Sequence, residues 1–270
     1  MKLAISNIAW PGEFDPAVAD LLRQFGLNGV EVAPTKIWAK PLEATKHEIA
    51  TYRGFWESRG IRIVSLQALL FGRSDLTIFE SAGTREATLN YLSGMLRLAG
   101  ELGAEALVFG SPKNRQVGGL SCLEIENIAV PFFRTLGEIA VQSHTVLCIE
   151  PNPPEYGCDF VTNSTQAVAL AMRVESSGFG VHLDSGAMTM AGENIESAIT
   201  NAFPLLRHFH VSEPNLKQIG TGGTDHRRFG RALATLNYDR WISIEMRPHD
   251  ADCVHAVDEA LQHALKSYST

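Results

Sequence analysis

The chain has 270 residues, of which 45% are hydrophobic and 20% are charged. This composition is typical of a globular protein and excludes an intrinsically disordered chain or a disulfide-stabilised scaffold. The 30 Asp and Glu residues outnumber the 23 Lys and Arg residues, for a net charge of −7. Because no long run of basic residues is present either, nucleic acid is not expected as a partner.

The four cysteines stand apart, with no Cys-x-x-Cys spacing, so we expect free thiols in a reducing compartment. Pro11, Gly12 and Glu13 interrupt the first apolar run before it reaches the length of a signal-peptide core. No stretch is apolar over the roughly 18 residues that a membrane helix needs. The sequence therefore predicts a soluble, cytoplasmic protein with no membrane partner.

Short β-type runs alternate with longer helix-type runs along the whole chain. Glycines follow several helical runs, as at Gly26, Gly60 and Gly103, and Asn163 supplies a capping side chain at the start of another. In chain order we predict strand 3–9, helix 16–25, strand 29–34, helix 42–58, strand 61–70, helix 84–102, strand 106–110, helix 123–142, strand 145–150, helix 163–176, strand 179–184, helix 195–202, strand 206–211, helix 227–236, strand 241–245 and helix 254–266.

Eight such units in 270 residues average about 34 residues each, close to the size of the units of a (β/α)8 barrel. The rival architecture is an open, doubly wound parallel sheet. That fold usually carries a phosphate-binding glycine turn after its first strand, whereas Trp10-Pro-Gly-Glu follows here and no Gly-x-Gly-x-x-Gly occurs. No linker divides the chain. We therefore predict an α/β fold, with a single (β/α)8 TIM barrel domain over residues 1–270.

Polar residues end four successive predicted strands. Glu150, Asp184, His210 and Glu245 each follow an apolar run, at separations of 34, 26 and 35 residues. In a (β/α)8 barrel the carboxyl ends of the strands form the active-site face, so these side chains are expected to meet. Three carboxylates buried together require a positive charge, which a divalent cation supplies. Three carboxylates and one imidazole favour Mn²⁺ or Mg²⁺, with Co²⁺ as a further option, over structural zinc.

Four segments between residues 147 and 248 carry a family resemblance. IEPNPPE, HLDSG, HFHVSE and ISIEMRP resemble the metal-binding segments of the xylose isomerase-like TIM-barrel superfamily, which includes ketose 3-epimerases, inosose dehydratases, hydroxypyruvate isomerases and endonuclease IV. The resemblance implies one divalent ion held by the same four residues, with Mn²⁺ expected and Mg²⁺, Co²⁺ or Zn²⁺ as alternatives. It also implies that Glu150 and Glu245 form an acid/base pair, and that the chain assembles as a homodimer or homotetramer.

The chain departs from the ketose 3-epimerases at two positions that handle substrate hydroxyls. Ala187 stands in place of a histidine, and Leu216 stands in place of an arginine. These differences argue against a simple transfer of the ketohexose specificity. Gln67 and Ser111 end the third and fourth strands, where endonuclease IV would need further histidines, so a nuclease is not expected.

The expected activity is that of a metal-dependent sugar isomerase or epimerase of carbohydrate metabolism, acting on a small carbohydrate or polyol. A carboxylate can remove a proton next to a carbonyl if a metal ion stabilises the resulting enediolate. Glu150 or Glu245 would remove the proton, and the other would return one. Two alternatives stay open: a metal-dependent lyase of the inosose dehydratase or keto-glycoside deglycosidase type, and a non-catalytic barrel that binds a sugar or a metal.

Four further residues are candidate substrate contacts. His182 shares the inward face of its strand with the predicted ligand Asp184, and Glu155 lies near the loop after the fifth strand. Arg247 lies on the rim, where it could meet an anionic group, and Trp10 follows the first strand, where its ring could form a wall of a sugar pocket. Core packing or a surface ion pair is the plain alternative for these residues.

Overall fold

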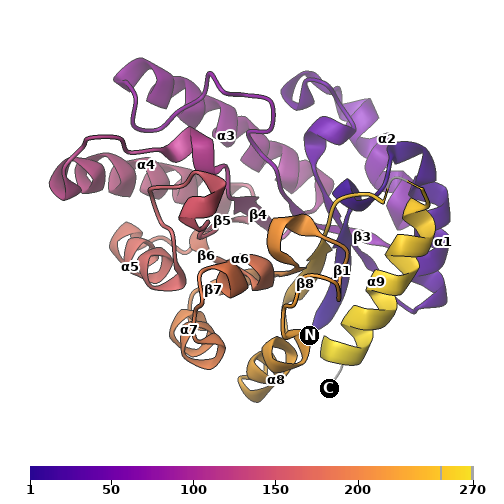
Figure 1. Ribbon diagram of the computed structural model, residues 1–270. Coiled ribbons are helices and arrows are strands. Elements are labelled where there is room, and N and C mark those ends of the chain that lie inside the picture. The colour runs from indigo at the N-terminus through magenta and orange to yellow at the C-terminus, as the bar shows by residue number, and fades with distance from the viewer. Residues whose placement is uncertain (250, 269–270) are drawn as a thin grey trace.

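The computed structural model describes residues 1–249 and 251–268. Its eight strands pair in chain order and in parallel, and the first strand also pairs with the last, so the sheet closes into a barrel (Figure 1). At the closure Lys2 lies opposite Trp241 and Ile5 opposite Ile244. The predicted (β/α)8 TIM barrel is confirmed, and the open sheet is excluded. The strands are β1 (Lys2–Ser6), β2 (Gly29–Val32), β3 (Arg62–Leu66), β4 (Ala106–Phe109), β5 (Val146–Ile149), β6 (Phe179–Asp184), β7 (Leu206–Ser212) and β8 (Trp241–Glu245).

Helices connect the strands and form a ring outside the barrel (Figure 1). They are α1 (Asp15–Gln24), α2 (Lys46–Glu57), α3 (Ala82–Leu102), α4 (Cys122–Gln142), α5 (Ser164–Val174), α6 (Ser185–Met190), α7 (Ile195–Ala202), α8 (His226–Thr235) and α9 (Cys253–Tyr268). Helices α2, α3 and α4 begin at capping boxes formed by Thr45, Ser81 and Ser121, whose side chains accept hydrogen bonds from the first turn. Among the described residues, no helix has the length and apolarity that crossing a bilayer requires.

Helix α6 is absent from the sequence prediction. It begins directly after β6, and Asp184 caps it by accepting a hydrogen bond of 2.5 Å from the backbone N–H of Ala187. Its six residues are too few to show a helical repeat, and they include Gly186. A Cβ at that glycine would lie 2.6 Å from the carbonyl carbon of Glu213, so α6 can pack this closely on the end of β7 only with a glycine there.

Two predicted strands are longer than the observed ones. The strand predicted at 3–9 ends at Ser6, because residues Asn7–Ala9 form a 3-10 turn. The strand predicted at 61–70 ends at Leu66, and Ala68 has a φ of 53°, which breaks the extended conformation. The apolar residues that follow both strands are buried in loops rather than in the sheet.

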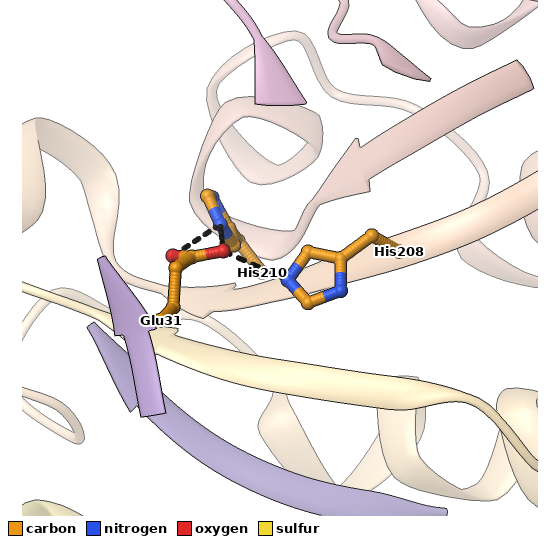
Figure 2. Close-up of side chains that lie close together, drawn as sticks. All are labelled: Glu31, His208 and His210. Carbon is orange, nitrogen blue, oxygen red and sulfur yellow. Dashed lines mark hydrogen bonds and ion pairs between the residues drawn. The ribbon is translucent and has the colours of Figure 1, made fainter. Parts of the chain in front are cut away.

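The interior of the barrel is polar near the carboxyl ends of the strands. Side chains alternate along each strand, so His208 and His210 of β7 point into the barrel while Phe209 and Val211 point out. Glu31 of β2 projects into the same interior and lies against both histidines (Figure 2). In TIM barrels, branched apolar side chains dominate the layers inside the barrel. Here the interior groups are polar and shielded from water, so they must form hydrogen bonds with one another.

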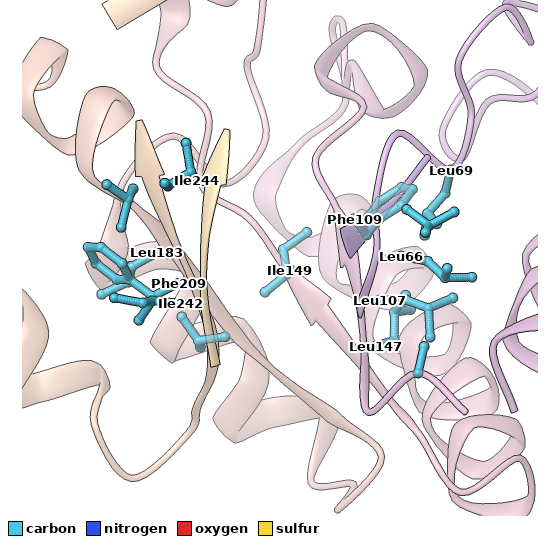
Figure 3. Close-up of a cluster of buried hydrophobic side chains, with 14 of the residues drawn as sticks. Leu66, Leu69, Leu107, Phe109, Leu147, Ile149, Leu183, Phe209, Ile242 and Ile244 are labelled. Carbon is cyan, nitrogen blue, oxygen red and sulfur yellow. The ribbon is translucent and has the colours of Figure 1, made fainter. Parts of the chain in front are cut away.

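The hydrophobic core lies between the strands and the helices. Figure 3 shows outward-facing Leu, Ile and Phe side chains from β3 to β8, and those drawn with labels are all buried. Phe133 of α4 packs against Phe109 of β4 and Phe179 of β6, with ring centroids 5.8 and 5.0 Å from its own. This packing holds the strands in place, and with them the side chains at their ends.

Candidate metal centre and active site

Four side chains meet at the carboxyl ends of β5 to β8. Glu150 follows β5, Asp184 and Glu245 end β6 and β8, and His210 lies near the end of β7. One ligand atom from each lies within 4.8 Å of the others, as in a group that could hold a metal ion. The Nδ1 atom of His210 is 3.2 Å from Glu245 Oε2, 3.8 Å from Glu150 Oε1 and 3.9 Å from Asp184 Oδ2. The structure thus brings together the four residues that the sequence singled out.

The charges of this cluster are unbalanced. Burial and the neighbouring charge of Glu245 raise the pKa of Glu150 to about 8 and that of Asp184 to about 6. Burial alone would lower the pKa of His210, yet Glu31 and Glu245 raise it well above its usual value. One imidazole cannot neutralise the surrounding carboxylates, so the cluster has an excess of negative charge.

The donor set fits a divalent cation. The buried Nδ1 atom of His210 has no hydrogen-bond partner among the described residues, and it faces the three carboxylates. Carboxylate oxygens with one imidazole nitrogen suit borderline and hard divalent ions. Glu150, Asp184, His210 and Glu245 are therefore the residues that would hold such an ion.

Neighbouring groups fix the Asp184 carboxylate and the backbone of Glu150. Asp184 accepts a hydrogen bond of 2.6 Å from Ser212 Oγ in addition to the one from the backbone of α6. Arg115, which is fully buried, donates from Nη2 to the backbone oxygen of Glu150 at 2.7 Å and to Asn152 Oδ1 at 2.8 Å. The Asp184 carboxylate and the backbone of Glu150 are thus held by contacts outside the four-residue cluster.

Sequence reasoning missed Glu31, which contacts the ring nitrogen of His210 opposite to the one that faces the three carboxylates. Figure 2 shows Glu31 beside His208 and His210. Its carboxylate is fully buried and lies 3.0 Å from His210 Nε2 and 2.9 Å from His208 Nε2. Ser65 Oγ and Gln67 Nε2 donate to it at 2.6 and 3.2 Å. The available signal was a single acidic residue inside the apolar run GVEVA, at an inward-facing position.

A cavity of about 300 Å³ opens above the four-residue cluster, a size at the lower end of small-molecule sites. Beside the three carboxylates it is lined by Pro112, Asn152, Tyr156, Ala187, Asn215, Leu216 and Arg247. A second cavity, of about 530 Å³, lies between residues 68–74 and 111–114. Pro112 lines both cavities, so the two adjoin. The two positions that differ from the ketose 3-epimerases, Ala187 and Leu216, are thus both in the wall of the smaller cavity.

The four predicted substrate contacts lie in different places. Arg247 lines the cavity, whereas Glu155 is exposed outside it and its neighbour Tyr156 takes the position in the wall. Trp10 is fully buried and donates from Nε1 to Asp15 at 2.7 Å. His182 is also fully buried, with Nε2 3.6 Å from Glu150 Oε1. Neither side chain lines the cavity. Trp10 packs in the core, whereas both ring nitrogens of His182 lack a hydrogen-bond partner among the described residues, so a substrate role for His182 stays a prediction.

Residues 19–268 match a family whose description is xylose isomerase-like TIM barrel. The chain belongs to this family. Its closed parallel barrel has the fold that the family name states.

Two curated relatives match part of the chain. A ketose 3-epimerase from Arthrobacter globiformis is 29% identical over 90 residues, which are 33% of this chain and 31% of that protein. A D-psicose 3-epimerase from Agrobacterium fabrum is 31% identical over 85 residues, or 32% of this chain and 29% of that protein. The chain thus matches just under a third of the length of each relative.

Solved structures match the fold over nearly its whole length. The apo form of 3-keto-D-glucoside 4-epimerase (YcjR) from E. coli has a TM-score of 0.82 at 19% identity, covering 98% of this chain and 99% of that one. A D-psicose 3-epimerase in the presence of D-fructose has a TM-score of 0.82 at 20% identity, covering both chains fully. The IolI protein with a binding zinc atom has a TM-score of 0.77 at 19% identity, again over both whole chains. At these identities the similarity shows the fold.

Proposed function

We propose that the protein is a divalent-metal-dependent sugar epimerase or isomerase, in which Glu150 and Glu245 act as the acid/base pair. The observation that carries this proposal is the meeting of three carboxylates and one unpartnered imidazole nitrogen at the floor of a cavity. The family and the epimerases among its relatives support a carbohydrate substrate with a carbonyl group.

The two glutamates are suited to moving a proton. Their side chains are each 12% exposed, so both reach the cavity, and they arrive there from different strands. Burial and the charges of Glu245 and Asp184 raise the pKa of Glu150, and a bound cation would offset these charges, so it is the position of Glu150 at the cavity that supports its role in proton transfer. A bound divalent ion would supply polarisation of the substrate carbonyl, which makes the adjacent C–H bond more acidic. One glutamate removes the proton, and return from the other glutamate on the opposite face inverts the carbon.

A lyase is the second candidate, and the cavity wall favours it. Ala187 and Leu216 cannot donate hydrogen bonds from their side chains, although both line the cavity. The chain therefore lacks, at these two positions, the hydrogen-bonding side chains expected of a ketose 3-epimerase, which supports a lyase acting on an inosose or keto-glycoside as the alternative. Arg247 is the predicted substrate contact that does line the cavity, and we retain it for an anionic or hydroxyl group.

Solvent deuterium exchange tests the proposal directly. Purified protein with added Mn²⁺ is incubated in D₂O with ketoses, inososes and keto-glycosides, and carbon-bound deuterium is followed by NMR. We expect metal-dependent exchange that Glu150→Gln and Glu245→Gln each reduce by at least about a hundredfold, as expected for the loss of an acid/base group. Inversion, isomerisation or a new vinylic signal then identifies an epimerase, an isomerase or a lyase.

The control is Glu138→Gln, which removes an exposed carboxylate of α4 and should leave the exchange rate unchanged. Parallel titrations compare Mn²⁺, proposed as the natural ion, with Mg²⁺, Co²⁺ and Zn²⁺. If the ion binds but no substrate of the panel exchanges, the result contradicts the enzyme proposal and favours a non-catalytic binding barrel. The cytoplasmic location and the homodimer or homotetramer stay predictions from the sequence.

A further inference from the structure

The carboxylate of Glu31 accepts hydrogen bonds from several neighbouring side chains. Glu31 is fully buried, and Ser65 Oγ and Gln67 Nε2 donate to its two carboxylate oxygens, an arrangement of donors that suits the ionised form. Oε1 is 3.0 Å from His210 Nε2, and Oε2 is 2.9 Å from His208 Nε2 (Figure 2). An ionised carboxylate can only accept hydrogen bonds. Both histidines therefore carry a hydrogen on Nε2.

This assignment has a consequence for the other nitrogen of His210. With Nε2–H directed at Glu31, the Nδ1 atom is the one left to face Asp184, Glu150 and Glu245, at 3.2 to 3.9 Å. A histidine that binds a metal through one nitrogen usually donates from the other to a carboxylate or carbonyl, which fixes the tautomer and the ring orientation. Glu31 occupies that place.

We propose that Glu31 is a positioning residue, which holds His210 in the tautomer and orientation that bind a divalent cation through Nδ1. This inference rests on the proposed function, because it takes His210 as a ligand. Glu31 does not line the cavity and lies on β2, away from the four strands that carry the ligands.

The surroundings restrain the His210 ring further. His182 packs edge-on against it, with ring centroids 4.1 Å apart and planes at 71°. Ser65 and Gln67 occupy the remaining acceptor sites of Glu31, and Gln67 also donates to Ser6 Oγ at 2.8 Å. Ser65 of β3 and Gln67 just after that strand thus hold the carboxylate, and Ser6 of β1 holds Gln67. The carboxylate in turn fixes the position of His210 on β7.

Replacing Glu31 by glutamine keeps the shape but removes one acceptor. The amide offers a single oxygen, whereas His210 and His208 each direct an Nε2–H at this side chain. One of the two histidines must then face an N–H₂ group and shift its own hydrogen to Nδ1. The single amide oxygen no longer fixes the hydrogen of His210 on Nε2 as the carboxylate does, and molecules in which that hydrogen moves to Nδ1 cannot bind a cation through this atom.

The test measures Mn²⁺ binding by calorimetry in the wild type, Glu31→Gln and His208→Gln, together with the visible spectrum of each protein loaded with Co²⁺. We expect the Kd for Mn²⁺ to rise ten- to a hundredfold in Glu31→Gln, the range typical of losing such a partner, with a changed Co²⁺ spectrum. His208→Gln keeps an N–H for Glu31 and leaves Glu31 free to accept from His210, so its Kd should stay within about threefold of wild type.

The outcomes separate the proposals. An unchanged Kd in Glu31→Gln, or an equal loss in both variants at equal thermal stability, overturns the role of Glu31 while the metal site stands. A wild type that binds no divalent ion overturns both this inference and the proposed function. Where Glu31→Gln does not fold, long-range ¹H–¹⁵N NMR of the wild type loaded with Zn²⁺ decides: Nε2–H on His210 supports the assignment, and Nδ1–H contradicts it.

Discussion

At the residue scale, Glu213 holds the glycine-rich segment between β7 and α8. Its carboxylate is buried and accepts hydrogen bonds from the backbone N–H groups of Gly220 and Thr224, at 2.8 and 3.0 Å. His226 Nε2 lies 3.2 Å from the same group, and His226 Nδ1 lies 3.0 Å from Tyr268 Oη. The glycine-rich segment 220–225 is therefore tied down by a single side chain.

This pairing predicts a pH dependence. Burial would raise the pKa of Glu213, but hydrogen bonds from His226 and Thr224 lower it to about 2, against 4.5 for the free group. The carboxylate thus stabilises the fold above pH 4.5, and the stabilisation, about 3 kcal/mol, disappears as the pH falls towards 2. We expect Glu213→Gln to be less stable than wild type by about that amount at pH 6, and the difference to fall to less than half near pH 3 and to vanish only below pH 2.

Urea denaturation at a series of pH values measures this difference, and the other carboxyl groups cancel in the comparison. The exposed Glu138→Gln should show no pH-dependent difference from wild type. A gap between wild type and Glu213→Gln that stays constant from pH 6 to pH 3 would show that the hydrogen bonds do not depend on the charge.

The sequence allowed the four proposed ligands to be predicted, but not the side chains that hold them in place. Glu150, Asp184, His210 and Glu245 were predictable because each ends an apolar strand, and strand ends converge in a closed barrel. The role of Glu31 depends on a side chain 179 residues away along the chain, which no local pattern shows. Arg115 was missed for the same reason, since its partners are a backbone oxygen and an amide on another loop.

At the scale of elements, α6 and the end of β7 form a close contact that holds Asp184. Gly186 allows it, because an added Cβ would lie 2.6 Å from the carbonyl carbon of Glu213 and 2.7 Å from Ser212 Oγ. Ser185 Oγ donates to the backbone oxygen of Ser212 at 2.9 Å, so the two elements are also joined by a hydrogen bond.

Two glycine substitutions should therefore act in opposite directions. Gly186→Ala forces β7 and α6 apart, and we expect a loss of about 1–3 kcal/mol in the free energy of unfolding, with weaker Mn²⁺ binding. Gly54→Ala, inside α2 with open space around it, should gain roughly 0.5–1 kcal/mol and leave Mn²⁺ binding unchanged. Chemical denaturation and calorimetry provide both readouts. A Gly186→Ala protein as stable as wild type would show that the contact between α6 and the end of β7 has room for an added methyl group.

The predicted boundaries are correct where the apolar pattern ends together with the strand or helix. This is the case for β6, β8 and α7, whose limits match the predicted ones. They were wrong where buried loops continue the apolar pattern, as after β1 and β3. Leu69 and Leu70 are buried like strand residues, although the chain has already turned at Ala68. An apolar sequence indicates that residues are buried, not that they belong to a strand, and in this barrel buried residues continue beyond the ends of the strands.

At the scale of the whole molecule, the proposed ligands come from strands spread over residues 150–245, so a bound ion would link β5, β6, β7 and β8. An ion that binds only the folded state stabilises it by about 2.7 kcal/mol at a hundred times its Kd. We expect Mn²⁺ at that concentration to raise the Tm of the wild type by several degrees and EDTA to reverse the rise. Asp184→Asn should respond far less, because it lacks one ligand charge.

Scanning calorimetry with EDTA, Mn²⁺ or Mg²⁺ in both proteins checks this expectation. An equal rise in wild type and Asp184→Asn would place the bound ion elsewhere on the molecule. The absence of any rise in wild type at saturating Mn²⁺ would mean that the four residues do not bind it.

The two cavities divide the barrel mouth between the halves of the chain. All four proposed ligands belong to the second half, whereas the wider cavity is walled by residues 68–74 and 111–114 of the first half. Under the proposed function, the loops after β3 and β4 would contact a substrate without carrying any of the four proposed ligands. Loop exchange between relatives at these two places, with Arg115 retained to hold the backbone of Glu150, would then change sugar specificity and leave the strands of the proposed ion site untouched.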